Sequence, residues 1–148
     1  MQAQILAPAA VLVCWSLVMM FWMARVRFAA LAQLGGGVSR AKPGGRGQDL
    51  QGVVPDEVNW KAHNYTNLME QPTLFYAAVA ILAISGPTGW DAACAWGYVA
   101  LRIAHSVYQA TVNRVLVRFR IFMTSTLFLM VLAVRALLVT SMTVYLGG

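Results

Sequence analysis

The sequence predicts an all-α integral membrane protein, built as an up-down bundle of four transmembrane helices. Two observations indicate this fold. Of the 148 residues, 59% are hydrophobic and only 11% are charged, whereas a soluble domain carries about 25% charged residues. The apolar residues also form four long runs with short polar or glycine-rich segments between them. The length suits one domain, which we expect to cover residues 1–148.

The first run covers Ile5–Ala24, which is long enough to cross a hydrocarbon core of about 30 Å at about 1.5 Å per residue. It has neither the basic start nor the short apolar core of a cleaved signal peptide, so we expect a first helix over about 5–27. Residues 35–55 are glycine-rich and basic and predict a flexible aqueous loop. A phosphate or lipid-headgroup site there is the weaker alternative, because the strand and helix context of a P-loop is missing.

The second helix is expected over about 56–84 and contains Pro72. A proline in a helix interior removes one hydrogen bond and usually kinks the helix, which membrane helices tolerate when neighbours compensate for the loss. The tight turn SGPTGW leads to a third helix over about 91–111. The short basic connection NRVLVRFR then leads to a fourth helix over about 119–146.

Lysine and arginine gather in the first and third connections between these helices and are missing from the second connection and from both terminal segments. The positive-inside rule therefore predicts that both termini lie outside the cytoplasm. Topology also accounts for the net charge of +6, so we expect no nucleic-acid binding. The basic residues of the two connections are Arg25, Arg27, Arg40, Lys42, Arg46, Lys61, Arg114, Arg118 and Arg120.

Two sets of polar residues, one in the second helix and one in the third, recur at spacings of three and four and so share a helix face. Placing an acid, an amide and an arginine in an apolar phase is costly and needs a reason. In the predicted topology both sets lie in the cytoplasmic half, beside the arginines that end the first helix and begin the fourth. The sets are His63, Asn67 and Glu70, and Arg102, His105 and Gln109.

In this layer Arg25, Arg102 and Arg118 face a single membrane-embedded acid, Glu70. The excess of cations predicts an anion site, because guanidinium groups grip carboxylates at two points, and the acid would hold an amino group. The implied ligand is small, zwitterionic and net anionic. A structural network in which Glu70 pairs with Arg102 is the alternative. We expect no metal, since the two histidines lack ligand spacing.

Four short motifs follow one another along the four expected helices. The first helix ends in Arg-x-Arg, the second carries Asn-x-x-Glu followed by a proline, the third carries Arg-x-x-His, and an arginine begins the fourth. In this order and spacing the chain resembles the MAPEG family, the membrane-associated proteins in eicosanoid and glutathione metabolism, and within it the bacterial members of microsomal glutathione transferase type. The matching residues are Arg25 and Arg27; Asn67, Glu70 and Pro72; Arg102 and His105; and Arg118.

The resemblance implies a homotrimer in the lipid bilayer of a bacterial inner membrane, with the co-substrate glutathione bound between neighbouring subunits near the cytoplasmic side. The family arginine that matches Arg118 helps to stabilise the glutathione thiolate, so Arg118 is the catalytic candidate. A nearby fixed cation lowers a thiol pKa and supplies the nucleophile at neutral pH. The residues expected to bind glutathione are Arg25, His63, Asn67, Glu70, Arg102 and His105.

The chain departs from the family pattern at four positions. His63 stands where an arginine is frequent, Gln109 replaces a tyrosine, and Phe119 and Phe122 replace a serine and a tyrosine. These losses weaken prostaglandin-type isomerase chemistry and leave a glutathione transferase or peroxidase acting on a lipophilic electrophile. We favour such an enzyme over a noncatalytic MAPEG-like subunit or scaffold in a larger membrane complex. A small transporter, or another membrane enzyme such as a prenylcysteine-type methyltransferase, is the third alternative.

Overall fold

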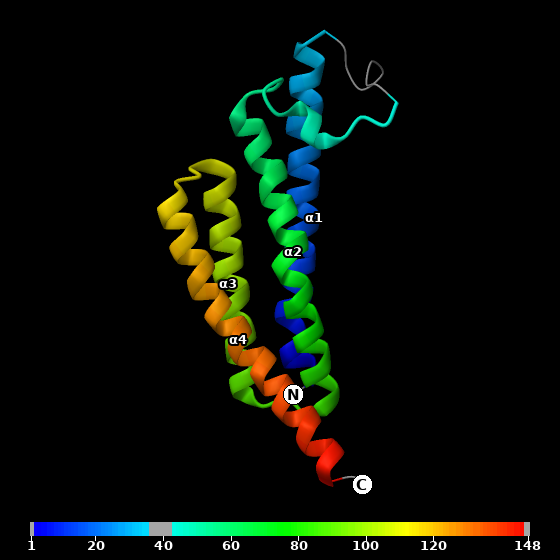
Figure 1. The fold of residues 1–148 in the computed structure, drawn as a ribbon, viewed down its shortest axis with the longest axis vertical. Helices are drawn as coiled ribbons and strands as arrows, with labels where there is room; N and C mark the ends of the chain where they lie inside the picture. Colours follow the sequence, from blue (N-terminus) through cyan, green and yellow to red (C-terminus); the bar gives the residue numbers. More distant parts are fainter. Residues whose placement is uncertain (1, 36–42, 147–148) are drawn as a thin grey trace.

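The structure is a computed structural model that describes residues 2–35 and 43–146. The described chain forms four long α-helices and one short 3-10 helix, with no strand among these residues. The helices run alternately up and down, and the N and C labels lie at the same end of the bundle (Figure 1). The all-α prediction is confirmed. The elements are α1 (Gln2–Gln33), η2 (Gly47–Leu50), α2 (Asp56–Ser85), α3 (Gly89–Thr111) and α4 (Val115–Leu146).

Three of the described helices are long and apolar enough to cross a membrane. They are α1, α2 and the Val115–Met142 part of α4. α3 is not among them, although it has 23 residues, because charged and polar residues such as Asp91 and Arg102 reduce its apolar character. The chain is therefore a helical membrane protein with three candidate spans among its described residues.

Two helix ends differ from the expected bounds by more than three residues. α1 continues to Gln33 instead of ending near residue 27, because the segment FAALAQ consists mainly of good helix formers. It stops before Gly35, whose φ of 73° is left-handed. α4 begins at Val115 instead of near residue 119. Asn113, at a left-handed φ of 54°, closes the turn from α3 within a few residues, so the basic segment after it is already helical.

The loop expected over residues 35–55 is described only in part. Residues 36–42, which include Arg40 and Lys42, lie outside the described residues. The remainder contains η2, which lies against α1 because the Nη2 of Arg27 donates a 2.8 Å hydrogen bond to the carbonyl of Gly47. This part of the connection is therefore anchored to the bundle by a side chain.

Each helix buries one stripe of apolar residues and turns the others outward. On α1 the buried residues Ile5, Leu12 and Met19 recur every seven positions. Phe75 of α2 stacks on Tyr98 of α3 at a ring-centroid distance of 4.4 Å. Large apolar side chains also cover the outer surface, which is typical of helices in contact with lipid.

The helices are offset along the bundle axis. At one end α1 and α2 extend beyond the α3–α4 turn, and at the other end the last turns of α4 extend beyond the α2–α3 turn (Figure 1). The hydrogen bond from Asn67 to Gln109, 2.8 Å long, joins the last turns of α3 to the first half of α2. The polar residues of α2 and α3 therefore meet near the α3–α4 turn.

Candidate functional site

A buried arginine lies at the centre of the polar layer. Arg102 of α3 is 1% exposed, and its Nη2 donates a 3.0 Å hydrogen bond to the carbonyl of Asn67 on α2. Its guanidinium carbon lies 5.2 Å from the ring centroid of Phe122 on α4 and 5.8 Å from that of Tyr98. Its Nε and Nη1 are buried without a hydrogen-bond partner among the described residues. Arg102 is therefore a desolvated cation with unused donors.

The carbonyl that Arg102 contacts lies in α2, close to a proline that removes one backbone hydrogen bond of this helix. Pro72 has no N–H, so the carbonyl of Leu68 loses its usual helical donor. The contact to the neighbouring carbonyl of Asn67 ties α3 to α2 at this turn. The side chain of Asn67 adds a second tie, because its Nδ2 donates to the Oε1 of Gln109.

His105 lies one turn after Arg102 on the same face of α3 and is 3% exposed. Its ring lies 5.9 Å from the ring of Phe122, centroid to centroid. Phe122 therefore contacts both Arg102 and His105 from α4. The structure thus brings together three of the predicted site residues, Asn67, Arg102 and His105.

Arg118, the predicted catalytic residue, lies in the first turn of α4. Its Nη1 donates a 2.7 Å hydrogen bond to the Oδ1 of Asn113 in the α3–α4 turn. Arg118 precedes Phe122 by four residues, so the two side chains share a face of α4. Because Phe122 contacts Arg102 and His105, Arg118 lies one helical turn from that cluster, and its guanidinium is held at the α3–α4 turn.

The other three predicted site residues do not join this cluster. Arg25, His63 and Glu70 are all exposed in the isolated chain. The Nε2 of His63 lies 3.0 Å from the Nε2 of Gln51, on the side of α2 that meets η2. The only ion pair among the described residues is formed elsewhere, so the alternative in which Glu70 pairs with Arg102 is not observed.

An apolar groove of about 530 Å³ runs between α2 and α4. Its polar groups are Gln71 and Thr126, joined by a 3.0 Å hydrogen bond, and Thr140. The Oε1 of Gln71 also accepts a 3.5 Å hydrogen bond from the hydroxyl of Tyr98, whose ring faces Arg102. The groove is thus connected to the buried arginine through two side chains.

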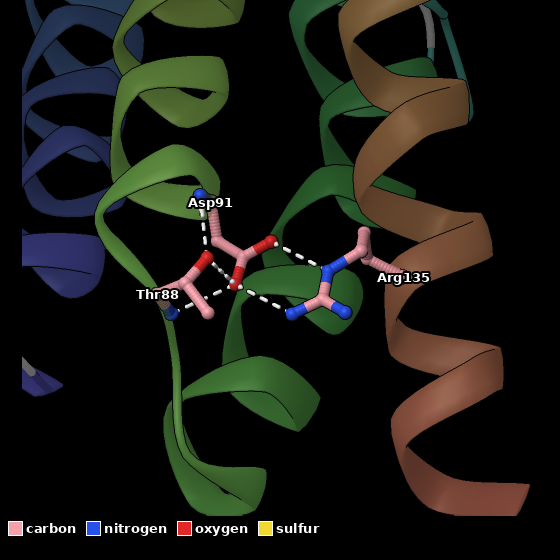
Figure 2. Close-up of polar contacts among 3 residues, drawn as sticks. All are labelled: Thr88, Asp91 and Arg135. Carbon is pink, nitrogen blue, oxygen red and sulfur yellow. Dashed lines mark hydrogen bonds and ion pairs between the residues drawn. The ribbon is translucent and has the colours of Figure 1, made fainter.

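Sequence reasoning missed an ion pair at the opposite end of α3. Asp91, 2% exposed, accepts hydrogen bonds from the Nε and Nη2 of Arg135 on α4 at 3.2 and 3.3 Å. Thr88 caps α3 and donates to the same carboxylate from its backbone nitrogen and its hydroxyl (Figure 2). The Thr-x-x-Asp spacing signals the cap, but no local pattern identifies Arg135 as the partner.

A second missed feature joins three helices through one hydroxyl. The Oγ of the fully buried Ser106 accepts hydrogen bonds from the Nε1 of Trp15 at 2.9 Å and from the Nδ2 of Asn64 at 2.8 Å. These residues come from α3, α1 and α2. Asn64 precedes Asn67 by three residues, so this link holds the polar turn of α2 in register with α3.

The chemistry of these groups favours binding of an anion. No group of three or more His, Cys, Asp or Glu side chains that could hold a metal ion occurs in the part of the chain that the structure describes. The unused donors belong to guanidinium groups, which bind carboxylates and phosphates.

Comparison with known proteins bears on this arrangement. The family model described as "MAPEG family" matches residues 5–138, nearly the whole chain. The match includes the whole of α2 and α3, most of α1 and α4, and every predicted site residue. No curated protein and no solved structure matches the chain. The family match alone covers more than half of the sequence, and the chain therefore belongs to the MAPEG family.

Proposed function

We propose that this protein is a glutathione-dependent membrane transferase or peroxidase that acts on a lipophilic electrophile. Membership of the MAPEG family makes it a membrane protein of a glutathione- and eicosanoid-related group. The observation that carries the proposal is the buried Arg102, whose Nε and Nη1 have no partner among the described residues. Leaving such donors unpaired costs about 1–3 kcal/mol per group. A carboxylate of glutathione would supply the missing acceptors.

The proposed glutathione site is completed by residues that one subunit leaves exposed. Arg25, His63 and Glu70 are exposed at the surface of the isolated chain, whereas Asn67 is half-buried and Arg102 and His105 are buried. A homotrimer with glutathione between neighbouring subunits would use both groups of residues. Because Arg102 is enclosed, a ligand reaches its guanidinium only when a covering side chain such as Phe122 moves.

In this proposal Arg118 stabilises the thiolate of bound glutathione, since a fixed cation favours the charged form of a nearby thiol. The guanidinium would exchange part of its contact with Asn113 for the sulfur. In a transfer reaction the thiolate sulfur forms a bond to the electrophilic carbon and the leaving group departs with its electron pair. In a peroxidase reaction the O–O bond of a hydroperoxide breaks, two glutathiones become a disulfide, and an alcohol and water are released.

We further propose that α3 also crosses the membrane, which gives four spans. At about 1.5 Å per residue its 23 residues extend about 35 Å, more than the hydrocarbon core of about 30 Å. Its charged residues Asp91 and Arg102 are buried against the other helices instead of facing lipid. The basic α1–α2 and α3–α4 connections would then lie in the cytoplasm and both termini outside, in a bacterial inner membrane.

The apolar groove between α2 and α4 supports a lipophilic second substrate. Its lining is almost wholly aliphatic, and its polar pair, Gln71 and Thr126, lies on the path toward Tyr98 and Arg102. A substrate dissolved in the bilayer would enter such a groove sideways without passing through water.

A noncatalytic membrane subunit is the second candidate function, and two observations favour it. The guanidinium of Arg118 already has a short contact to Asn113, and Arg102 is closed off by aromatic rings. Both arginines would then maintain the packing of a charged layer used for assembly.

Calorimetric titration of detergent-purified protein with glutathione separates the two candidates. For the enzyme we expect binding at millimolar or better affinity, loss of binding in Arg102→Met and weaker binding in Glu70→Gln. Arg118→Ala should retain the fold but lose the thiolate absorbance that appears when glutathione is added. Arg114→Ala is the matched control, because Arg114 is an exposed arginine in the same α3–α4 connection. No binding at millimolar glutathione would refute the enzyme and favour the noncatalytic subunit.

A further inference from the structure

A polar pocket lies between η2 and the ends of α1 and α2, on the part of the bundle that extends beyond the α3–α4 turn. Its volume is about 230 Å³, room for several water molecules at about 30 Å³ each. It is separate from the groove between α2 and α4, and Arg102 does not line it. Its polar lining comes from Arg27, Gln48, Gln51, His63, Tyr65 and Thr66, with Gly47 beside Arg27.

Arg27 provides the charge of this pocket. Its Nη2 donates to the carbonyl of Gly47 at 2.8 Å, and its Nε is buried with no hydrogen-bond partner among the described residues. No carboxylate pairs with it, since the single ion pair in the described chain joins Asp91 and Arg135. The pocket therefore combines an uncompensated cation with the polar side chains of Gln48, Gln51 and Thr66.

The pocket lies where an apolar span reaches the membrane surface. Arg27 follows the end of the apolar run of α1 by three residues, about 4.5 Å along the helix axis. Five residues before Arg27, Trp22 packs beneath the Nζ of Lys61, which lies 5.7 Å from the ring centroid, and Tyr65 lines the pocket. Tryptophan and tyrosine beside lysine and arginine are typical of the interface between hydrocarbon and headgroups.

From this charge and this depth, we propose that the pocket binds the phosphate of an anionic lipid headgroup, such as that of phosphatidylglycerol. Arg27 supplies the charged hydrogen bonds, and the side chains of Gln48 and Thr66 contact the remaining oxygens. Basic pockets at the ends of membrane helices are suited to such headgroups. A bound headgroup would hold η2 against α1 and α2, and so connect the α1–α2 loop to the lipid surface.

Gly47 offers a way to test the pocket without changing its charge. A Cβ at this position would lie 2.5 Å from the Nη1 of Arg27, so the guanidinium has to move away. Gly47→Ala therefore displaces the cation and keeps the net charge, whereas Arg27→Gln removes the cation. Arg114→Gln is the control, because it removes an exposed arginine that does not line the pocket.

The experiment measures thermal unfolding of the full chain in neutral detergent, titrated with short-chain phosphatidylglycerol, phosphatidylcholine or inorganic phosphate. We expect phosphatidylglycerol to raise the Tm of the wild type and of Arg114→Gln. Phosphatidylcholine and inorganic phosphate should have little effect. The apparent affinity for phosphatidylglycerol should fall roughly tenfold or more in Arg27→Gln, which removes the cation, and by less in Gly47→Ala, which only shifts it.

Three results would overturn the proposal. Unchanged affinity in a folded Arg27→Gln would show that the pocket is not the site. An equal loss in Arg114→Gln would indicate general electrostatic attraction. An equal Tm shift with inorganic phosphate would assign the pocket to a free phosphate instead of a lipid. His63, which lines the pocket, is also a proposed glutathione residue, so glutathione binding is measured on the same variants. We expect wild-type glutathione affinity in Arg27→Gln, and a parallel loss of glutathione binding would also overturn the proposal by assigning the pocket to glutathione.

Discussion

Replacing Arg102 by methionine tests whether this buried arginine serves a ligand or the fold. Its Nε and Nη1 are unpaired and buried, at a cost of about 1–3 kcal/mol each, or about 2–6 kcal/mol together. Its hydrogen bond to Asn67 contributes about 1.5–3 kcal/mol. Its two aromatic contacts contribute about 0.5–2 kcal/mol each. The cost of the unpaired donors and the gain from the hydrogen bond and the aromatic contacts nearly cancel. Methionine, which is also an unbranched side chain, fills most of the space that arginine occupies.

We therefore expect Arg102→Met to change the free energy of unfolding by less than about 2 kcal/mol without ligand. A buried arginine that completed a satisfied network would cost about 3–5 kcal/mol to remove. Glutathione should behave differently in the two proteins. At one hundred times the dissociation constant, a ligand stabilises its protein by about 2.7 kcal/mol, and the variant should lose this gain.

Unfolding by dodecyl sulfate in mixed micelles, with and without glutathione, measures both quantities. Arg114→Met serves as the control, since an exposed arginine should alter neither. A loss above about 4 kcal/mol in the unliganded variant, with the glutathione effect retained, would refute the reasoning and make Arg102 a structural residue.

Three further predictions concern the packing around this layer, and the same unfolding titration checks each of them. Ser106→Ala should lower stability by about 2 kcal/mol or more, because two buried donors lose their acceptor, whereas the exposed Ser141→Ala should not; equal effects would contradict this. Gly97→Ala should lower stability by about 1–3 kcal/mol, since its Cβ would lie 2.7 Å from the Cε1 of a phenylalanine on α4. Gly89→Ala has open space and is its control, so a stable Gly97→Ala would show that the ring moves freely. Thr88→Ala should cost about 0.5–2 kcal/mol through loss of the α3 cap, and an unchanged midpoint would mean that the buried aspartate keeps its contacts without it.

The sequence was sufficient to predict the helical architecture, because run length and hydropathy are local properties. It also predicted that Arg102 and His105 share a face, since a spacing of three determines this in any helix. The link from Asp91 to Arg135 was not predictable in this way. Its partners lie 44 residues apart, and only the register between α3 and α4 brings them together.

Exposure of the polar face of α2 was equally hard to predict. Asn67 and Glu70 are one turn apart, yet Asn67 bonds to α3 and Glu70 is exposed in the isolated chain. Helical spacing places two residues on one side of a helix but does not determine where the packed interface ends. That limit depends on how the neighbouring helices are offset.

The composition of α3 has a consequence for how the protein enters the membrane. A segment that contains Asp91, Arg102 and His105 partitions poorly into lipid by itself. Arg102 lies in its middle part, where a charge costs about 2.5–3.5 kcal/mol on insertion scales. α1, α2 and α4 meet the apolar requirement that α3 misses. Crossing by α3 would then depend on α2 and α4, which cover its charged residues and would have to enter the membrane together with it. Substitutions that weaken this pairing would act during biosynthesis, leaving α3 at the membrane surface and the chain with the wrong topology.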